Sequence, residues 1–139
     1  MSMDRTITVS RPDMVEALWN QVLPYLKPAL AEDLFADEGF LKQLLLDDDA
    51  LMFLAHVAGV LKGAAIVQIE LTRKKIVNIL CLGGEDFFQW KQPLNDALTE
   101  YARKMGCNII TAMGRRGWEK LWPEVVPSGK AMFYKEISA

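Results

Sequence analysis

The junction between an apolar strand and the following helix is the strongest candidate for chemistry in this sequence. Residues 76–82 form the strand, Gly83-Gly84-Glu85-Asp86 interrupts it, and an amphipathic helix begins at Asp86 or Phe87. A helix N-terminus that follows a strand is a common place to hold a phosphate, because its backbone N–H groups and its dipole favour anions. Here that place also carries two carboxylates, so the pattern alone does not define an activity.

A second group of polar residues lies on a predicted hairpin. A three-residue turn at the basic residues 73–75 places Glu70 opposite Asn78, whereas a two-residue turn would pair Glu70 with an apolar residue. We therefore prefer the three-residue turn, which puts Glu70, Asn78 and Gln68 on one face of the sheet. A carboxylate beside an amide can act as a general base with a positioning partner. The alternative is a polar cross-strand pair that faces solvent.

His56 and the pair Arg115 and Arg116 are further residues whose types could do chemistry. His56 alternates with apolar residues on an early strand and has no obvious partner in sequence. Arg115 and Arg116 lie between glycines, where they could bind a phosphate or carboxylate, contact a neighbouring protein or form a solvated turn. With one histidine and no close cluster of Cys, His and carboxylate residues, the sequence predicts no metal site.

Composition restricts the class of protein that must position these residues. The chain has 139 residues, of which 51% are hydrophobic and 24% charged, and it lacks an apolar run of about 18 residues that could cross a bilayer. It therefore predicts one soluble domain with no membrane partner. No signal-peptide pattern opens the sequence, which favours a cytoplasmic location. Cys81 and Cys107 stand in apolar surroundings and are expected to be buried thiols without a disulfide.

The charge balance bears on the kind of partner. The net charge is −2 and the isoelectric point is about 5.4. A general nucleic-acid binder is expected to have a basic face and a high isoelectric point. The sequence therefore argues against nucleic acid as a partner.

The hydrophobic periodicity predicts an α/β domain with a mixed, mostly antiparallel sheet flanked by helices on both sides. Pro24 and Pro28 are expected to end the first helix, and Pro93 either follows an irregular turn or kinks the long helix. Trp90 and Phe87 either pack onto the sheet or form an exposed aromatic cluster at an interface. The expected elements are a strand at 6–9, a helix from about 13 to 23, a helix at 29–46, strands at 50–57, 61–72 and 76–82, a helix from 86 or 87 to 105, a strand at 108–112, a short helix at 117–121 and a strand at 130–137.

This order of elements resembles the GNAT acetyltransferase superfamily over nearly the whole chain. The most telling residues are Ile79-Leu80-Cys81-Leu82, the helix that ends in residues 100–107, and the strand after it. A closer resemblance is to the small GNAT-like proteins of tailed phages and prophages. It rests on Gly83-Gly84-Glu85-Asp86, Trp90, Gly106-Cys107 and Gly114-Arg115-Arg116-Gly117-Trp118.

The resemblance implies a site for acetyl-CoA or another acyl-CoA between the fourth and fifth strands. In that site Leu80, Cys81 and Leu82 would pair with the pantetheine arm, and Gly83, Gly84 and Lys91 would lie near the phosphates. It also implies that Glu70, with Asn78, removes a proton from an amine acceptor. Tyr134 could protonate the leaving thiolate, or it could be a packing residue of the last strand.

The sequence departs from the superfamily at the loop that holds the pyrophosphate of CoA. That loop, Arg/Gln-x-x-Gly-x-Gly/Ala in the superfamily, falls at residues 86–91, where neither glycine is present and Phe88 and Trp90 add bulk. A carboxylate about 5 Å from a phosphate costs roughly 3 kcal/mol at an effective dielectric constant near 20. This is enough to weaken CoA binding about a hundredfold.

Two functions from different classes follow. The first is a noncatalytic or weakly active GNAT-like phage or prophage protein that acts through protein contacts, with a protein partner or as a homo-oligomer, in the host cytoplasm or the virion. The alternative is a functional acyl-CoA-dependent N-acyltransferase that acts on a small amine acceptor. Fold alone does not choose between them.

Overall fold

In the part of the chain that the structure describes, five strands form one mixed sheet in which spatial order follows chain order. The computed structural model describes residues 4–31, 37–71 and 73–112. Three consecutive pairings are antiparallel, and the last one, between β4 and β5, is parallel. The strands are β1 (Arg5–Ser10), β2 (Leu51–Val57), β3 (Val60–Leu71), β4 (Lys75–Gly84) and β5 (Ile109–Ala112).

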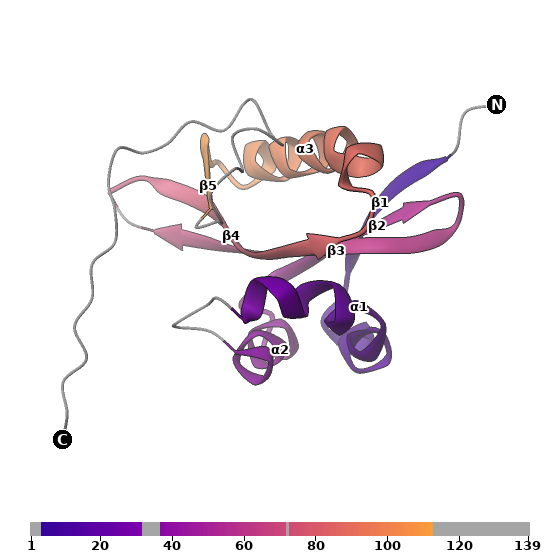
Figure 1. Cartoon of the computed structure of the whole chain (residues 1–139). Helices are drawn as coiled ribbons and strands as arrows, with labels where there is room; N and C mark the ends of the chain where they lie inside the picture. Colours follow the sequence, from indigo (N-terminus) through magenta and orange to yellow (C-terminus); the bar gives the residue numbers. More distant parts are fainter. Residues whose placement is uncertain (1–3, 32–36, 72, 113–139) are drawn as a thin grey trace, which may run out of the picture.

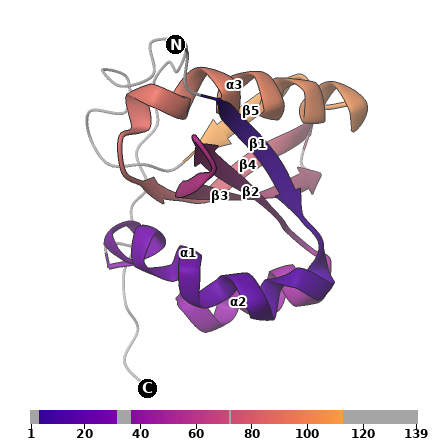
Figure 2. The same cartoon turned by 90° about the vertical axis from the view of Figure 1, so that its right-hand side faces the viewer.

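Helices cover both faces of this sheet. A short 3-10 turn, η1 (Pro12–Met14), leads into α1 (Val15–Leu30), which lies with α2 (Glu38–Leu46) on one face. α3 (Phe87–Lys104) lies on the other face, as Figure 1 and Figure 2 both show. None of the described helices is long and apolar enough to span a membrane. The predicted fold class, a mixed sheet flanked by helices, is confirmed.

Each face of the sheet has its own hydrophobic core. Trp90, Leu94 and Leu98 of α3 pack on residues such as Val67 and Val77. Val22 and Leu26 of α1 and Leu41 of α2 pack on the opposite face, against residues such as Met52 and Ile66. Successive side chains of a strand point to opposite faces of the sheet. If a strand residue belongs to one core, the residues before and after it therefore face the other side.

The prediction that Pro24 and Pro28 break the first helix is wrong. Both prolines lie inside α1, which continues to Leu30. Val22 and Leu26 on the two sides of Pro24 are fully buried. We attribute the continuity to this packing, which offsets the roughly 3 kcal/mol that an interior proline costs a helix.

The second helix is shorter than predicted. Ala29 and Leu30 belong to α1, and α2 begins only at Glu38, where the Asp37 side chain accepts a 2.8 Å hydrogen bond from the Phe40 N–H. An aspartate at this position satisfies an N–H that has no partner within the helix. The helix then ends at Leu46, before the three aspartates, as predicted.

The long helix is confirmed, but no irregular turn precedes Pro93. α3 begins at Phe87 and contains Pro93 within its span. Its buried residues follow helical spacing, which places one face on the sheet. Gly106, with φ of +74°, follows its end, as the sequence predicts for a helix C-terminus. The predicted helix at 117–121 and strand at 130–137 lie outside the described residues.

The antiparallel meander is confirmed, whereas the register of its last hairpin differs from the prediction. Glu70 lies opposite Ile76, and Asn78 lies opposite Gln68. Glu70 and Asn78 are therefore diagonal neighbours on one face and not a directly opposed pair. Leu71 pairs with Lys75, so Lys75 belongs to β4 and not to the turn, and the predicted turn was one residue too late.

Candidate functional site

A β-bulge in β4 lies close to the residues that pair with β5. Ile66 pairs with Cys81 while Val67 pairs with Ile79, so Leu80 is an extra residue on β4. Over the described range 73–112, the parallel ladder joins residues 76–79 of β4 to Ile109–Ala112 of β5. Bulges bend a strand and often re-aim it next to functional sites. Within the described residues, β4 beyond Ile79 is paired on its β3 side alone.

Three half-buried polar residues form a row across three neighbouring strands. Asn78 Nδ2 of β4 donates a 3.0 Å hydrogen bond to Glu70 Oε1 of β3. Thr111 Oγ1 of β5 donates a 2.9 Å hydrogen bond to Asn78 Oδ1. The predicted pair Glu70 and Asn78 is thus brought together, with Thr111 as a third member that the sequence did not suggest.

The polar row lies on the face of the sheet that carries α1 and α2. Val77 and Ile79 pack under α3, so Asn78 between them points to the other face. Gln68, opposite Asn78, shares that face and donates a 3.1 Å hydrogen bond to the Asp49 carbonyl oxygen. This hydrogen bond holds Asp49, in the turn after α2, next to the polar row.

Gly83 and Gly84, predicted to lie near phosphates, are the last residues of β4. A Cβ atom on Gly83 would collide with the Tyr25 carbonyl oxygen of α1. A Cβ atom on Gly84 would lie 2.7 Å from the Trp90 ring. Both glycines thus let other parts of the chain approach β4 closely. A role for them in ligand binding stays a prediction.

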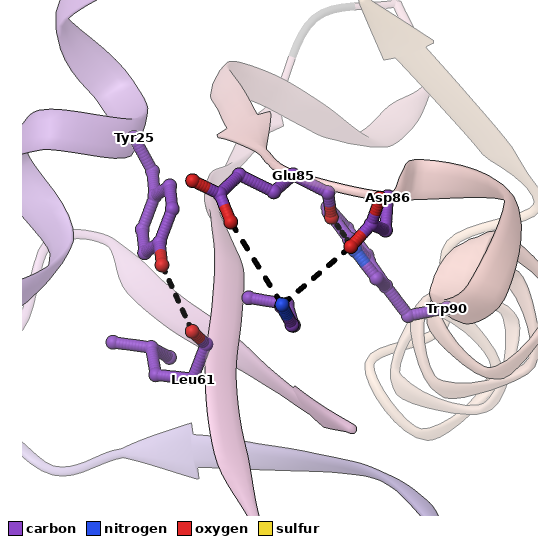
Figure 3. Close-up of polar contacts among 6 residues, drawn as sticks. Tyr25, Leu61, Glu85, Asp86 and Trp90 are labelled. Atoms are coloured by element: carbon purple, nitrogen blue, oxygen red, sulfur yellow. Dashed lines mark hydrogen bonds and ion pairs between the residues drawn. The ribbon is translucent and has the colours of Figure 1, made fainter. Parts of the chain in front are cut away.

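The two carboxylates at the start of α3 share one cation. Lys62 Nζ of β3 lies 3.8 Å from Glu85 Oε2 and 3.5 Å from Asp86 Oδ2 (Figure 3). The Lys62 side chain is 25% exposed, while both carboxylates are more than half exposed. Lys62 therefore offsets part of the negative charge that the sequence places at this helix N-terminus.

Trp90 is a core residue and not part of an exposed cluster. Its side chain is 1% exposed, and its ring meets that of Phe87 edge to face at 4.8 Å. Of the two alternatives for Phe87 and Trp90, packing onto the sheet is therefore confirmed and the exposed cluster is excluded. Phe88, in contrast, is 68% exposed, and Lys91 Nζ lies 5.4 Å from the centre of its ring.

Residues 87–91, where the sequence resemblance predicts a pyrophosphate loop, are the first turn of a regular helix. Asp86 precedes this helix with a left-handed backbone, φ of 54°, and its side chain does not cap it. The Gln89 N–H donates to the Asp86 carbonyl oxygen at 2.8 Å, so this N–H is already used. Phosphates placed here would meet a helix start and two carboxylates rather than a glycine-lined loop.

The remaining candidates carry less chemistry. Cys81 and Cys107 are buried and form no disulfide, as predicted. His56 is half-buried in β2, opposite Thr6. Among the described residues no group of three or more His, Cys, Asp or Glu could hold a metal ion. Tyr134, Arg115 and Arg116 lie outside the described residues.

Comparison with known proteins identifies the fold. No protein-family model matches the sequence, and no curated protein is significantly similar to it. Solved structures do match over nearly their whole length. A ribosomal-protein-alanine N-acetyltransferase from Brucella melitensis has a TM-score of 0.67 and 15% identity, covering 96% of this chain and 100% of its own.

Two further structures agree. A GNAT family acetyltransferase from Staphylococcus aureus has a TM-score of 0.64 and 20% identity, covering 99% of this chain and 100% of its own. The aminoglycoside N-acetyltransferase AAC(6')-Iy, solved with CoA, has a TM-score of 0.65 and 14% identity, covering 98% and 97%. Identities this low show a shared fold. The chain therefore has the fold of the GNAT acetyltransferases.

Proposed function

We propose that this chain is an acyl-CoA-dependent N-acyltransferase that acts on an amine. One observation carries the proposal: the bulge at Leu80 of β4 lies two residues from Asn78, whose amide holds the Glu70 carboxylate. Strand N–H and C=O groups near a bulge can bind a linear amide-containing ligand, and a held carboxylate can act as a base. The fold shared with acetyltransferases supports the same activity.

The donor would be held along β4 by Leu80, Cys81 and Leu82. The pantetheine arm of acyl-CoA contains amides, which can hydrogen-bond to strand N–H and C=O groups as an added strand does. When bound, an acyl thioester supplies an activated carbonyl carbon. Gly83, Gly84 and Lys91 are the proposed contacts of its phosphate end. The glutamate and aspartate before α3 make this the weaker half of the site.

Glu70 is the proposed general base. Its carboxylate would take a proton from the acceptor amine, directly or through a water molecule, while Asn78 holds it in place. The amine nitrogen then bonds to the acyl carbon, the carbon–sulfur bond breaks, and the sulfur leaves as a thiolate. Tyr134 is the proposed donor of a proton to that thiolate.

A second candidate function is favoured by the start of α3. A regular helix over residues 87–91, the carboxylates of Glu85 and Asp86, and the exposed Phe88 are unlike a phosphate loop and more like a surface for another protein. On this reading the chain is a noncatalytic GNAT-like protein of phage or prophage origin. It would act through a protein partner or as a homo-oligomer, in the host cytoplasm or the virion.

An acyl-transfer assay separates the two candidates. Purified protein is incubated with acetyl-CoA and a panel of primary amines, including aminoglycosides and peptides, while free thiol and acetylated product are both measured. The proposal predicts enzyme-dependent product for at least one amine. Glu70→Gln should lower kcat/KM by about 10²–10⁴-fold. Thiol release without acetylated product, or equal rates for both proteins, would support the second candidate.

A further inference from the structure

We propose that Thr111 is a positioning residue for the catalytic carboxylate of Glu70, acting through Asn78. This inference rests on the proposed acyltransferase function and names one more residue of the same site. Thr111 does not touch Glu70. Its hydroxyl instead determines which way the Asn78 amide faces, and the amide determines where the carboxylate points.

The hydrogen bonds of the row have only one consistent direction. An ionised carboxylate only accepts hydrogen bonds, so Asn78 must present its NH₂ group to Glu70, as the 3.0 Å contact shows. The amide oxygen Oδ1 then faces β5, where the Thr111 hydroxyl donates to it at 2.9 Å. A hydroxyl that donates on this side therefore favours the one amide orientation that binds the carboxylate.

The three residues of the polar row are held by the paired backbones of β3, β4 and β5. Asn78 and Thr111 face each other on adjacent parallel strands. Glu70 is on the long antiparallel partner of β4. The three side chains thus come from three hydrogen-bonded strands, and sites built on strands are held more precisely than sites on loops.

Loss of the Thr111 hydroxyl would leave the half-buried Asn78 oxygen without its donor. The amide could then rotate, and with it the carboxylate would lose its fixed partner. A base must lie within hydrogen-bond reach of the proton it removes, so a small displacement lowers the rate of the chemical step more than it lowers binding. The effect should therefore fall on kcat and not on KM.

A matched pair of variants isolates the hydroxyl. Thr111→Val keeps the branched shape and removes the hydroxyl, whereas Thr111→Ser keeps the hydroxyl and removes a methyl group. With the amine found in the transfer assay, we expect Thr111→Val to lower kcat about tenfold with KM for acetyl-CoA changed less than twofold. Thr111→Ser should stay within about twofold of wild type. If Thr111→Val does not fold, Thr111→Ala takes its place, with Thr111→Ser as the same control.

A double variant tests whether Thr111 acts through Glu70. In the background of Glu70→Gln, where the base is already lost, Thr111→Val should cause less than a twofold further loss of kcat. An unchanged kcat for Thr111→Val, equal losses for the valine and serine variants, or full additivity with Glu70→Gln would each overturn this inference while leaving the proposed function intact. No transfer by the wild-type protein would overturn both.

Discussion

Trp90 fastens the start of α3 to the end of β4, because its indole Nε1–H donates a 2.7 Å hydrogen bond to the Glu85 carbonyl oxygen (Figure 3). The ring lies where Cβ atoms on Gly63 and Gly84 would otherwise be. Strand end, connecting residues and first helical turn are therefore one packed joint. The segment that the sequence suggests as a ligand loop is in large part a structural element.

Replacing Trp90 should destabilise the protein. Trp90→Phe removes the hydrogen bond and leaves a cavity over the two glycines, so we expect the free energy of unfolding to fall by about 1–3 kcal/mol. Phe88→Leu, two residues away on the exposed side of the helix, should change it by less than about 0.5 kcal/mol. Urea denaturation of the two variants measures this, and equal effects would contradict the packed joint.

Adding a methyl group at Gly84 tests the same joint from the strand side. The new Cβ of Gly84→Ala would lie 2.7 Å from Trp90 Cζ2 and would collide with the Lys62 carbonyl oxygen, which neither group can easily avoid. We expect a loss of about 1–3 kcal/mol in the free energy of unfolding. Gly39→Ala in α2 is the control, because its nearest atom, Asp37 Oδ1, is 3.5 Å away. A loss at Gly39 as large as that at Gly84 would show that close approach is not the cause.

Most of the described fold follows from periodicity and turn residues. Alternation predicted the meander, and Gly106 predicted the end of α3. The prolines gave a wrong prediction, because the sequence shows their local preference to break a helix but does not show the burial of Val22 and Leu26 that offsets it. The hairpin register was wrong for a different reason: Lys75 pairs with Leu71 in the sheet, whereas the basic residues 73–75 suggest a turn that includes it.

Removing the carboxylates before α3 should strengthen CoA binding selectively. In the double variant Glu85→Gln, Asp86→Asn, Lys62 loses both of its anionic partners and becomes available to phosphates. We expect calorimetry at low salt to show about tenfold tighter acetyl-CoA binding, with the gain reduced near 1 M salt. Acetyl-pantetheine, which has no phosphate, is the control ligand and should bind both proteins equally. An equal gain for that ligand would contradict the electrostatic explanation.

Stability at high pH should depend on Tyr101. Burial raises the pKa of this phenol above its ordinary value of 10.0, with smaller contributions from Cys107 and Asp48. The folded state therefore holds the proton more tightly than the unfolded state. The resulting stability is fully present below pH 10 and is lost as the pH rises through the higher pKa of the folded protein. The comparison is urea denaturation at pH 9 and pH 11. Wild type should lose more stability than Tyr101→Phe over this interval, and equal losses would contradict the assignment.

The candidate site was only partly visible in the sequence. The side chains of Glu70 and Asn78 could be placed on one face because side-chain direction alternates along a strand. Thr111 could not, since its neighbourhood depends on the register of a parallel pair formed after an intervening helix of 18 residues. The sequence also could not predict the packing role of Gly83, because that role depends on where α1 crosses β4.

Binding of acetyl-CoA to the purified wild-type chain tests the proposed function most directly. Isothermal titration calorimetry should give a dissociation constant below about 100 μM, which corresponds to about −5.5 kcal/mol or tighter. Such binding would place an acyl-CoA site on this fold despite the carboxylates before α3. No detectable heat at millimolar acetyl-CoA would contradict the acyltransferase proposal and favour a noncatalytic domain that acts through protein contacts.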